Sequence, residues 1–323
     1  MVTILVTGCA GFIGSHLCTL LLNKGFNVIG VDNFDTFYSR TAKELNLAKF
    51  KAHPAFRFYE IDITKGLDTI AGENIKAVIH LAAKAGVRPS IDDPAGYLHV
   101  NIVGTQKVHE FMQAKAIDKL VFASSSSVYG NNKKMPFSED DPVDNPISPY
   151  AFTKKACELM NYTFHHLYHI DIINLRFFTV YGPGQRPDLA IHKFVERISK
   201  NQPLVLFGNG DTARDYTYVD DTVSGIYSAL EYCLNNTGIY TTVNLGNNKP
   251  VKLTELVEVI YAAMGKEKNV VYEDMQAGDV DITFADITKA GKLLHYKPAT
   301  DLAAGIKKFI AWYNTRNEQG NIE

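Results

Sequence analysis

Residues 3–14 read Thr-Ile-Leu-Val-Thr-Gly-Cys-Ala-Gly-Phe-Ile-Gly, and this stretch predicts the fold of the chain. Its first half is a short apolar run typical of a strand buried on both faces. Its second half carries glycines in the spacing GxxGxxG, and apolar residues at helical spacing follow. A strand, a glycine turn and a helix N-terminus form a site for a pyrophosphate, because free N–H groups face it and absent Cβ atoms let the backbone approach. The expected cofactor-binding residues of this turn are Gly8, Gly11, Phe12, Ile13 and Gly14.

An acidic residue after the second expected strand indicates which cofactor binds. Residues 26–31 form another apolar run, and it ends in Asp32, eighteen residues after Gly14. A carboxylate near this spacing binds the ribose hydroxyls of the adenosine. It also disfavours a ribose 2′-phosphate, so we predict NAD rather than NADP, with Asp32 and the adjacent Asn33 at this ribose. The glycine spacing, the flanking strand and helix, and Asp32 together disfavour the alternative, which is three glycines in an ordinary strand–helix loop.

The composition is that of a globular chain with no general attraction to polyanions. The 323 residues are 46% hydrophobic and 21% charged, with a formal net charge of −2, so the chain can bury one large core or two smaller ones. The sequence lacks a signal-peptide pattern and any apolar run that could span a bilayer. We therefore expect a cytoplasmic protein without nucleic-acid or membrane partners. We expect no metal site, because the cysteines and clustered histidines lack partner ligands: Cys9, Cys18, Cys157, Cys233, His165, His166 and His169.

Strand-like and helix-like segments alternate along the first half of the chain. Strands are expected at 56–61, 77–81, 120–123 and 172–176, with helices at 98–111 and 152–167. This alternation predicts an α/β fold with a doubly wound parallel sheet of the Rossmann type, and ligands bind outside the carboxyl ends of such strands.

Beyond residue 176 the pattern changes, and we expect an interleaved smaller C-terminal substrate-binding lobe. Prolines and glycines between residues 183 and 210 break the sequence into short pieces. A helix at 219–234 and a strand at 242–245 are expected to rejoin the large sheet. The predicted domains are an NAD-binding Rossmann domain of residues 1–176 plus 218–246, and a nucleotide-sugar-binding lobe of residues 177–217 plus 247–323.

A tyrosine, a lysine and a serine form the predicted catalytic set. Ser148 is the expected N-cap of a helix on which Tyr150 and Lys154, four residues apart, share one face. The pKa of a free tyrosine is about 10, so a useful phenolate needs cationic help, which Lys154 and an oxidised nicotinamide could supply. A surface Tyr–Lys pair is the alternative for the helix alone. A serine of the run 124–127, directly after the strand 120–123, could hold the substrate oxygen that Tyr150 deprotonates.

Together these motifs resemble the extended short-chain dehydrogenase/reductase family, in its nucleotide-sugar epimerase/dehydratase branch. The carriers of the resemblance are the glycine turn, the serine run before Val128-Tyr129-Gly130, and Tyr-x-x-x-Lys. Further similar segments cover nearly the whole chain, at residues 80–84, 101–105, 176–183, 214–220 and 278–280.

The resemblance implies roles for the matching residues. Tyr150 would be the base, Lys154 its electrostatic partner and a ribose ligand, and Ser125 a hydroxyl partner. Arg214 would bind the substrate diphosphate, and Asp279 the ribose of its nucleotide; a turn residue is the alternative for Asp279. Further NAD contacts are implied for Asp62, Ile63, Leu81, Lys84 and Asn101, although Lys84 could also be a solvated loop charge. The resemblance further implies a homodimer joined through helices 98–112 and 152–168.

The residues before Val128 favour epimerisation over water loss. Dehydratases and decarboxylases of this family carry an acid where this chain has Ser126 and Ser127, and a serine cannot titrate near neutrality. In the implied reaction Tyr150 takes the 4-OH proton while C4 gives hydride to NAD⁺. The 4-keto sugar then turns over and recovers hydride on its other face.

The sugar is predicted from residues 179–190, which are most similar to those of the UDP-glucuronate 4-epimerases. Arg186, Ser126 and Thr179 would hold the C6 carboxylate of UDP-glucuronic acid, and the product would be UDP-galacturonic acid. Gly184 departs from the Trp or Arg of many relatives. The alternatives are a UDP-glucose or UDP-N-acetylglucosamine 4-epimerase, a UDP-glucuronate decarboxylase, a nucleotide-sugar dehydratase, and a non-catalytic NAD-binding protein.

Overall fold

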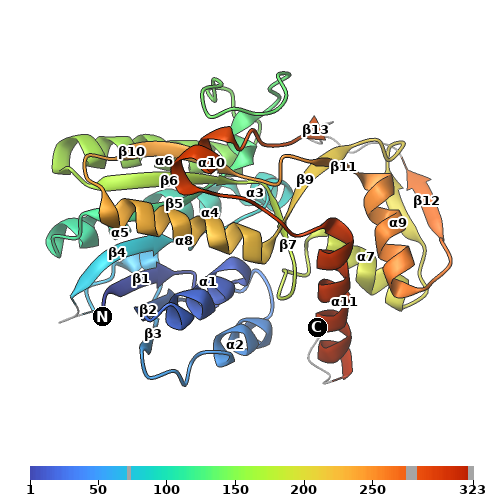
Figure 1. Ribbon diagram of the computed structural model, residues 1–323, viewed down its shortest axis with the longest axis horizontal. Coiled ribbons are helices and arrows are strands. Elements are labelled where there is room, and N and C mark those ends of the chain that lie inside the picture. Colours follow the sequence, from blue (N-terminus) through green and yellow to red (C-terminus); the bar gives the residue numbers. More distant parts are fainter. Residues whose placement is uncertain (71–73, 274–281, 319–323) are drawn as a thin grey trace.

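A parallel sheet dominates the computed structural model, which describes residues 1–70, 74–273 and 282–318 (Figure 1). Among these residues seven strands pair in the order β10-β6-β5-β4-β1-β2-β3, and every pairing is parallel. The order reverses between β1 and β4, where open α/β sheets bind their ligands. The strands are β1 (Thr3–Thr7), β2 (Asn27–Asp32), β3 (Phe56–Glu60), β4 (Ile75–His80), β5 (Lys119–Ser125), β6 (Asp171–Phe177) and β10 (Tyr240–Leu245). The predicted doubly wound fold is confirmed.

Helices cover both faces of this sheet, as Figure 1 shows. Successive residues of β1 point to opposite faces, so Ile4 and Val6 belong to one apolar cluster and Leu5 to the other. The first cluster lies under α1 (Phe12–Asn23) and α8 (Val219–Asn235), and the second under α5 (Gly104–Ala114) and α6 (Pro149–Tyr168). The apolar run Ile4–Val6 of β1 is therefore buried on both faces, as the sequence predicts.

The helix expected at 98–111 is longer and less regular than predicted. Helical turns run through α4 (Pro94–Leu98), a π-helical turn η2 (His99–Val103) and α5. Inside the π turn, the Asn101 carbonyl accepts hydrogen bonds from Thr105 Oγ1 at 2.6 Å and from Cys157 Sγ at 3.2 Å. These side-chain donors add to the backbone N–H of Gly104, which bonds to the same carbonyl.

A second group of elements lies beside the large sheet, at the right of Figure 1. Within the described residues, β9 pairs with three short strands, and β8 pairs with β12. The strands are β7 (Thr179–Tyr181), β8 (Leu204–Phe207), β9 (Ala213–Tyr218), β11 (Pro250–Lys252), β12 (Val270–Glu273) and β13 (Ile282–Thr283). The accompanying helices are α7 (Ala190–Ser199), α9 (Leu253–Met264) and α11 (Leu302–Glu318). The strand and helix expected at 242–245 and 219–234 rejoin the large sheet as β10 and α8.

The remaining elements are short and lie at the edges of the large sheet. Helix α10 packs on α8 and β10. The described helices include none that combines the length and apolar character needed to cross a membrane. The short elements are α2 (Arg40–Ala48), η1 (Ile63–Lys65), α3 (Val87–Asp92), η3 (Ser126–Tyr129) and α10 (Thr288–Leu294).

Candidate active site

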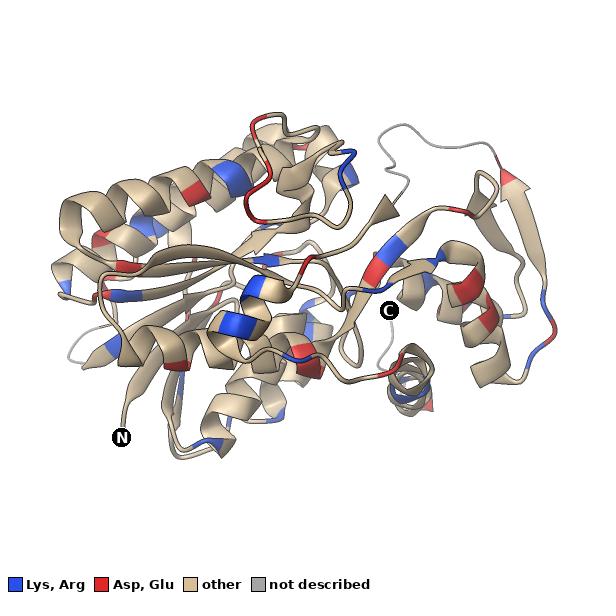
Figure 2. Ribbon diagram, turned by 45° about the horizontal axis from the view of Figure 1, so that its top comes forward, with Lys and Arg blue, Asp and Glu red and all other residues tan. Residues whose placement is uncertain are grey.

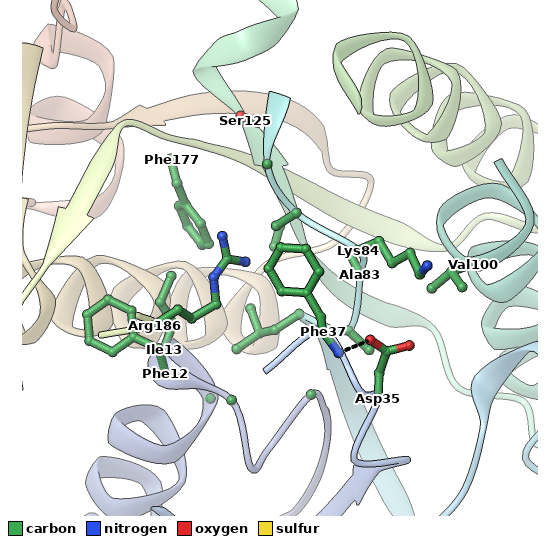
Figure 3. Close-up of a pocket in the computed structure, with 18 of the residues that line it drawn as sticks. Phe12, Ile13, Asp35, Phe37, Ala83, Lys84, Val100, Ser125, Phe177 and Arg186 are labelled. Atoms are coloured by element: carbon green, nitrogen blue, oxygen red, sulfur yellow. Dashed lines mark hydrogen bonds between the residues drawn. The ribbon is translucent and has the colours of Figure 1, made fainter. Parts of the chain in front are cut away.

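A cavity of about 480 Å³ opens at the carboxyl ends of the central strands. Figure 3 shows that residues from β5, the first glycine turn and the segment after β7 face the same space. Most site residues predicted from the sequence line this cavity: Gly8, Gly11, Phe12, Ile13, Gly14, Asp32, Asn33, Asp62, Ile63, Leu81, Lys84, Ser125, Ser126, Tyr150, Lys154, Thr179 and Arg186.

The glycine turn between β1 and α1 has no room for side chains. Gly8 adopts a φ of +74°, and a Cβ atom on it would lie 2.9 Å from the Ala82 amide nitrogen. A Cβ atom on Gly14 would lie 2.0 Å from the Gly8 carbonyl oxygen. Because α1 starts at Phe12, its unpaired N–H groups face the cavity at this turn. The turn therefore fits a pyrophosphate, as predicted.

Asp32 is buried at the end of β2 and fixes the backbone around the cavity. Its two carboxylate oxygens accept hydrogen bonds from the backbone N–H groups of Ala10, at 3.1 Å, and Phe34, at 2.9 Å. Burial raises the pKa of Asp32, and the charge of Lys43 offsets part of this effect. Each carboxylate oxygen can accept a further hydrogen bond, so the group can still receive ribose hydroxyls.

The predicted catalytic residues meet at one point of the cavity. Lys154 is buried, and its Nζ donates a 2.7 Å hydrogen bond to the carbonyl of Ala123 in β5. Burial lowers the pKa of Lys154 to about 8. Burial raises the pKa of Tyr150, whereas a hydrogen bond with Ser125 and the charge of Arg186 act in the opposite direction. Ser125 donates from Oγ to Ser127 Oγ at 3.1 Å and lines the same cavity as Tyr150, so both hydroxyls are available to one substrate hydroxyl.

A buried ion pair behind the catalytic residues was not predicted from the sequence. Glu158 receives Nε and Nη2 of Arg176, each at 2.9 Å, and its Oε1 also accepts from Ser124 Oγ at 2.6 Å. These bonds tie α6 to β5 and β6 next to Ser125. The signal in the sequence is the spacing of Tyr150, Lys154 and Glu158, which places all three on one face of α6.

Arg186 extends into the cavity between aromatic residues. Figure 3 shows its side chain between Phe177 and Phe37, and its guanidinium carbon lies 5.1 Å from the centre of the Phe37 ring. Its Nε and Nη2 donate to the two carboxylate oxygens of Asp188, each at 2.9 Å. The bidentate pair fixes the plane of the guanidinium, and neither Asp188 nor Phe37 was predicted as part of the site.

Several predicted residues lie around the cavity wall or away from it. Asn101 does not line the cavity; its amide accepts from the Lys84 N–H at 2.8 Å and donates to the Lys84 carbonyl at 3.0 Å, so it holds the loop that carries Lys84. Lys84 lines the cavity, and its Nζ lies 2.8 Å from Asp93. Arg214 lies in β9, outside this cavity. Asp279 lies outside the described residues.

Sequence reasoning also missed residues near the expected adenosine end. Lys43 is buried, lines the cavity, and donates from Nζ to the carbonyl of Asp35 at 2.6 Å. Tyr38 lines the same wall beneath the Lys43 ammonium, which lies 4.7 Å from its ring centre. Both residues follow β2 in a segment without a recognisable motif. In the described part of the chain, no group of three or more metal-ligating side chains comes together.

The parallel sheet, the glycine turn and the Ser125–Tyr150–Lys154 set define an extended short-chain dehydrogenase/reductase. Residues 5–309 match the protein family described as GDP-mannose 4,6 dehydratase, and the chain belongs to this family.

Relatives with assigned reactions extend over nearly the full chain. A protein of Thermodesulfobacterium geofontis named UDP-glucuronate 4-epimerase is 44% identical over 312 residues, which cover 95% of each chain. The crystal structure of a UDP-glucuronic acid 4-epimerase from Bacillus cereus, in complex with UDP-glucuronic acid and NAD, matches with a TM-score of 0.91 and 36% identity, over 97% of this chain and 99% of that one. A UDP-glucose 4-epimerase from Thermotoga maritima matches with a TM-score of 0.88 and 31% identity, over 98% and 99%.

Proposed function

We propose that this protein is an NAD-dependent 4-epimerase that interconverts UDP-glucuronic acid and UDP-galacturonic acid. The observation that carries the proposal is the convergence of Arg186, Ser126 and Thr179 on the cavity that holds Tyr150. A guanidinium and two hydroxyls beside the base suit a sugar with a carboxylate at C6. The identities of 44% and 36% to proteins named for this substrate support the same assignment.

The cofactor site uses residues that the cavity brings together. The turn from Gly8 to Gly14 would hold the pyrophosphate, Asp32 and Asn33 the adenosine ribose, and Lys154 the ribose of the nicotinamide. Asp62, Ile63, Leu81 and Lys84 line the wall between these points. When bound, NAD⁺ accepts hydride from C4 of the sugar and returns it to the opposite face.

Side chains of the protein remove and return the proton of the 4-hydroxyl. Tyr150 removes the proton of the 4-hydroxyl and returns it once the configuration at C4 is reversed. Ser125, which lines the same cavity as Tyr150, holds the same substrate oxygen. In place of a carboxylic acid before Val128 the chain has Ser126 and Ser127. Neither can act as the acid that dehydration of a neutral hexose at C6 requires, and UDP-glucuronic acid has a carboxylate at C6 and no hydroxyl to lose there. The 4-keto sugar is therefore reduced again at C4.

The carboxylate contacts have a second task, because oxidation at C4 makes the substrate a β-keto acid. Such an acid loses CO₂ readily when its carboxylate stands perpendicular to the plane of the C4 carbonyl. Asp188 fixes the guanidinium plane of Arg186, and this orients the group that receives the carboxylate. Arg186 then sets affinity, and Ser126 and Thr179 restrain the carboxylate against decarboxylation.

Several features outside the cavity belong to the same proposal. Residues 177–217 and 247–323 form the nucleotide-sugar-binding lobe, in which Arg214 and Asp279 bind the diphosphate and the ribose of UDP. The protein works as a homodimer in the cytoplasm, where its four buried free cysteines remain reduced. The dimer forms through exposed apolar side chains on α4, η2 and α6: Leu98, Val103, Phe152, Leu159 and Tyr162.

A substrate panel tests the reaction. Purified protein is incubated separately with UDP-glucuronic acid, UDP-glucose and UDP-N-acetylglucosamine, and the products are identified by NMR. We expect the highest kcat/KM for UDP-glucuronic acid and UDP-galacturonic acid as its product. A preference for either neutral sugar would reject the assignment.

Two substitutions test the restraint on the carboxylate. Thr179→Val and Ser126→Ala each remove one hydroxyl, so a fraction of the 4-keto intermediate should lose CO₂ and appear as a UDP-pentose. Thr315→Val, at an exposed position of α11, is the control. If neither cavity variant releases more CO₂ than this control, the restraint mechanism is wrong.

A further inference from the structure

A second, smaller cavity lies between three segments that are far apart in the sequence. Tyr38 reaches it from the segment before α2 and Asn46 from α2 itself. Gln185 reaches it from the turn before α7, and Trp312 and Arg316 from α11. Its volume is about 40 Å³. One water needs about 10–15 Å³ of such space and occupies about 30 Å³ of liquid, so the cavity has room for about three waters or one compact polyatomic ion. Tyr38 also lines the main cavity, so the two spaces share a wall.

The polar lining of this second cavity is left without partners. Tyr38 Oη, Gln185 Oε1 and Trp312 Nε1 are all buried, and none has a hydrogen-bond partner among the described residues. Gln185 as a whole is only 3% exposed. An unpaired buried polar group costs about 1–3 kcal/mol, so three at one cavity indicate a polar occupant.

Arg316 adds a cation to this lining. It is 9% exposed, and burial lowers its pKa. Within residues 1–70, 74–273 and 282–318, the one group that stabilises the charge of Arg316 is the ring of Trp312. The guanidinium carbon lies over this ring, 5.8 Å from its centre. A cation–π contact compensates only part of the desolvation of a guanidinium, and a carboxylate or another anion is its usual buried partner.

We propose that this second cavity is a binding site for one small protonated oxyanion, hydrogenphosphate or hydrogencarbonate. The guanidinium of Arg316, the indole N–H of Trp312 and the Tyr38 hydroxyl donate to its oxygens. Gln185 Oε1 is an acceptor and needs a donor, which the O–H of a protonated oxyanion supplies. Sulfate and chloride have no such hydrogen at neutral pH, so the lining discriminates against them.

The bound anion joins three segments around the active-site wall. Gln185 and Pro187 line the second cavity on either side of Arg186, which lines the main one. His192 of α7 supports the same turn by donating from Nδ1 to the Gln185 carbonyl at 3.0 Å. Gly184, with a φ of +84°, also lines the cavity and contributes no side chain to fill it.

Trp312 is the single tryptophan of the chain, so its fluorescence reports directly on the site. The full-length protein, saturated with NAD and UDP so that phosphate cannot report from the main cavity, is titrated with phosphate, hydrogencarbonate, sulfate and chloride at constant ionic strength. We expect a saturable change in Trp312 emission with phosphate or hydrogencarbonate and none with the other two. No saturable change with either protonated ion, or the same curve with sulfate, would overturn the proposal. The readout is binding, so it does not depend on turnover.

Two variants and a control localise the binding. Arg316→Gln should weaken binding about tenfold or more, and Tyr38→Phe, which removes one hydroxyl, about two- to tenfold. Arg197→Gln makes the same chemical change in α7 outside this cavity and should leave the titration unchanged. If Arg316→Gln does not fold, judged by circular dichroism, the Tyr38→Phe result decides. An affinity equal to that of the parent in the folded variants would place the anion elsewhere and refute the assignment.

Discussion

At the scale of single residues, the site combines groups whose burial opposes their chemical task. Burial raises the pKa of Tyr150, although a base must lose its proton. The contact with Ser125 and the charge of Arg186 act against burial, and the positive charge of an oxidised nicotinamide would add to them. In the proposed role as base, Tyr150 should therefore lose its proton more readily once the oxidised cofactor is bound than in its absence.

Removing the phenol oxygen tests this role. Tyr150→Phe keeps the ring, so the fold should persist, while turnover of UDP-glucuronic acid should fall by about 10²- to 10⁴-fold. Tyr168→Phe, at an exposed position in the last turn of the same helix, is the matched control and should retain the parent rate. A Tyr150→Phe rate within a few-fold of the parent would assign the base elsewhere.

Lys154 gives a prediction about pH and stability. Its pKa is about 8 in the folded protein and about 10.4 in an unfolded chain, so the unfolded state binds more protons between these values. We therefore compare the melting temperature of the parent with that of Lys154→Met. The difference, parent minus variant, should be constant below pH 8 and should increase from pH 8 to pH 10.4. Over this pH range the free energy of unfolding of the parent should rise by about 3 kcal/mol relative to the variant. Both NAD-free proteins are compared by thermal unfolding in the same buffers, and parallel curves would contradict the lowered pKa.

At the scale of elements, the glycine turn and the β5–α6 contact hold the site together. The turn brings α1 so close to β1 that Gly14 faces the Gly8 carbonyl directly. The Lys154–Ala123 hydrogen bond and the Glu158–Arg176 pair fix α6 against β5 and β6. Breaking a buried pair by removing one partner costs about 3–5 kcal/mol, so these contacts favour one alignment of helix and sheet.

Gly14→Ala tests the packing of the turn. The added Cβ atom would lie 2.0 Å from a backbone oxygen, which cannot move without shifting the turn. We expect NAD affinity, measured by calorimetry, to fall more than tenfold. Gly291→Ala is the control, because in α10 its Cβ atom would meet nothing closer than 3.8 Å. It should bind NAD normally and gain about 0.5–1 kcal/mol in stability from helix propensity. Normal NAD binding by Gly14→Ala would refute the tight fit.

At the scale of the whole molecule, segments of the chain alternate between the large sheet and the smaller group of elements beside it. The segment from β7 to β9 leaves the large sheet after β6, and β10 returns to it. The main cavity therefore has walls from both groups, with Tyr150 on α6 and Arg186 before α7. In Figure 2 the positions of acidic and basic residues, coloured red and blue, are interspersed along the ribbon, in keeping with the net charge of −2.

The proposed dimer gives a prediction at this scale. Leu159 is 58% exposed on α6, so Leu159→Glu would place a charge in the proposed helix contact and should convert the dimer to a monomer. Val271→Glu, at an exposed position of β12, should leave the assembly unchanged. Sedimentation velocity measures both, and a dimeric Leu159→Glu protein would exclude this surface as the interface.

The sequence by itself determined the features that depend on local spacing. A buried strand, the GxxGxxG turn and Asp32 predicted the fold and the cofactor, and Tyr150 and Lys154 share a helical face because they are four residues apart. Helical periodicity could not predict the π turn at His99–Val103, since its side-chain donors include Cys157 from another helix.

Only the tertiary structure decided which distant side chains meet. Glu158 pairs with Arg176, Lys43 lies near Asp32, and Tyr38 shares a cavity with Trp312. Sequence periodicity reports which face of an element is apolar, but not which polar groups another element brings to it. Those contacts follow from how the helices pack on the sheet, because most buried polar groups pair with whichever groups the packing places nearby.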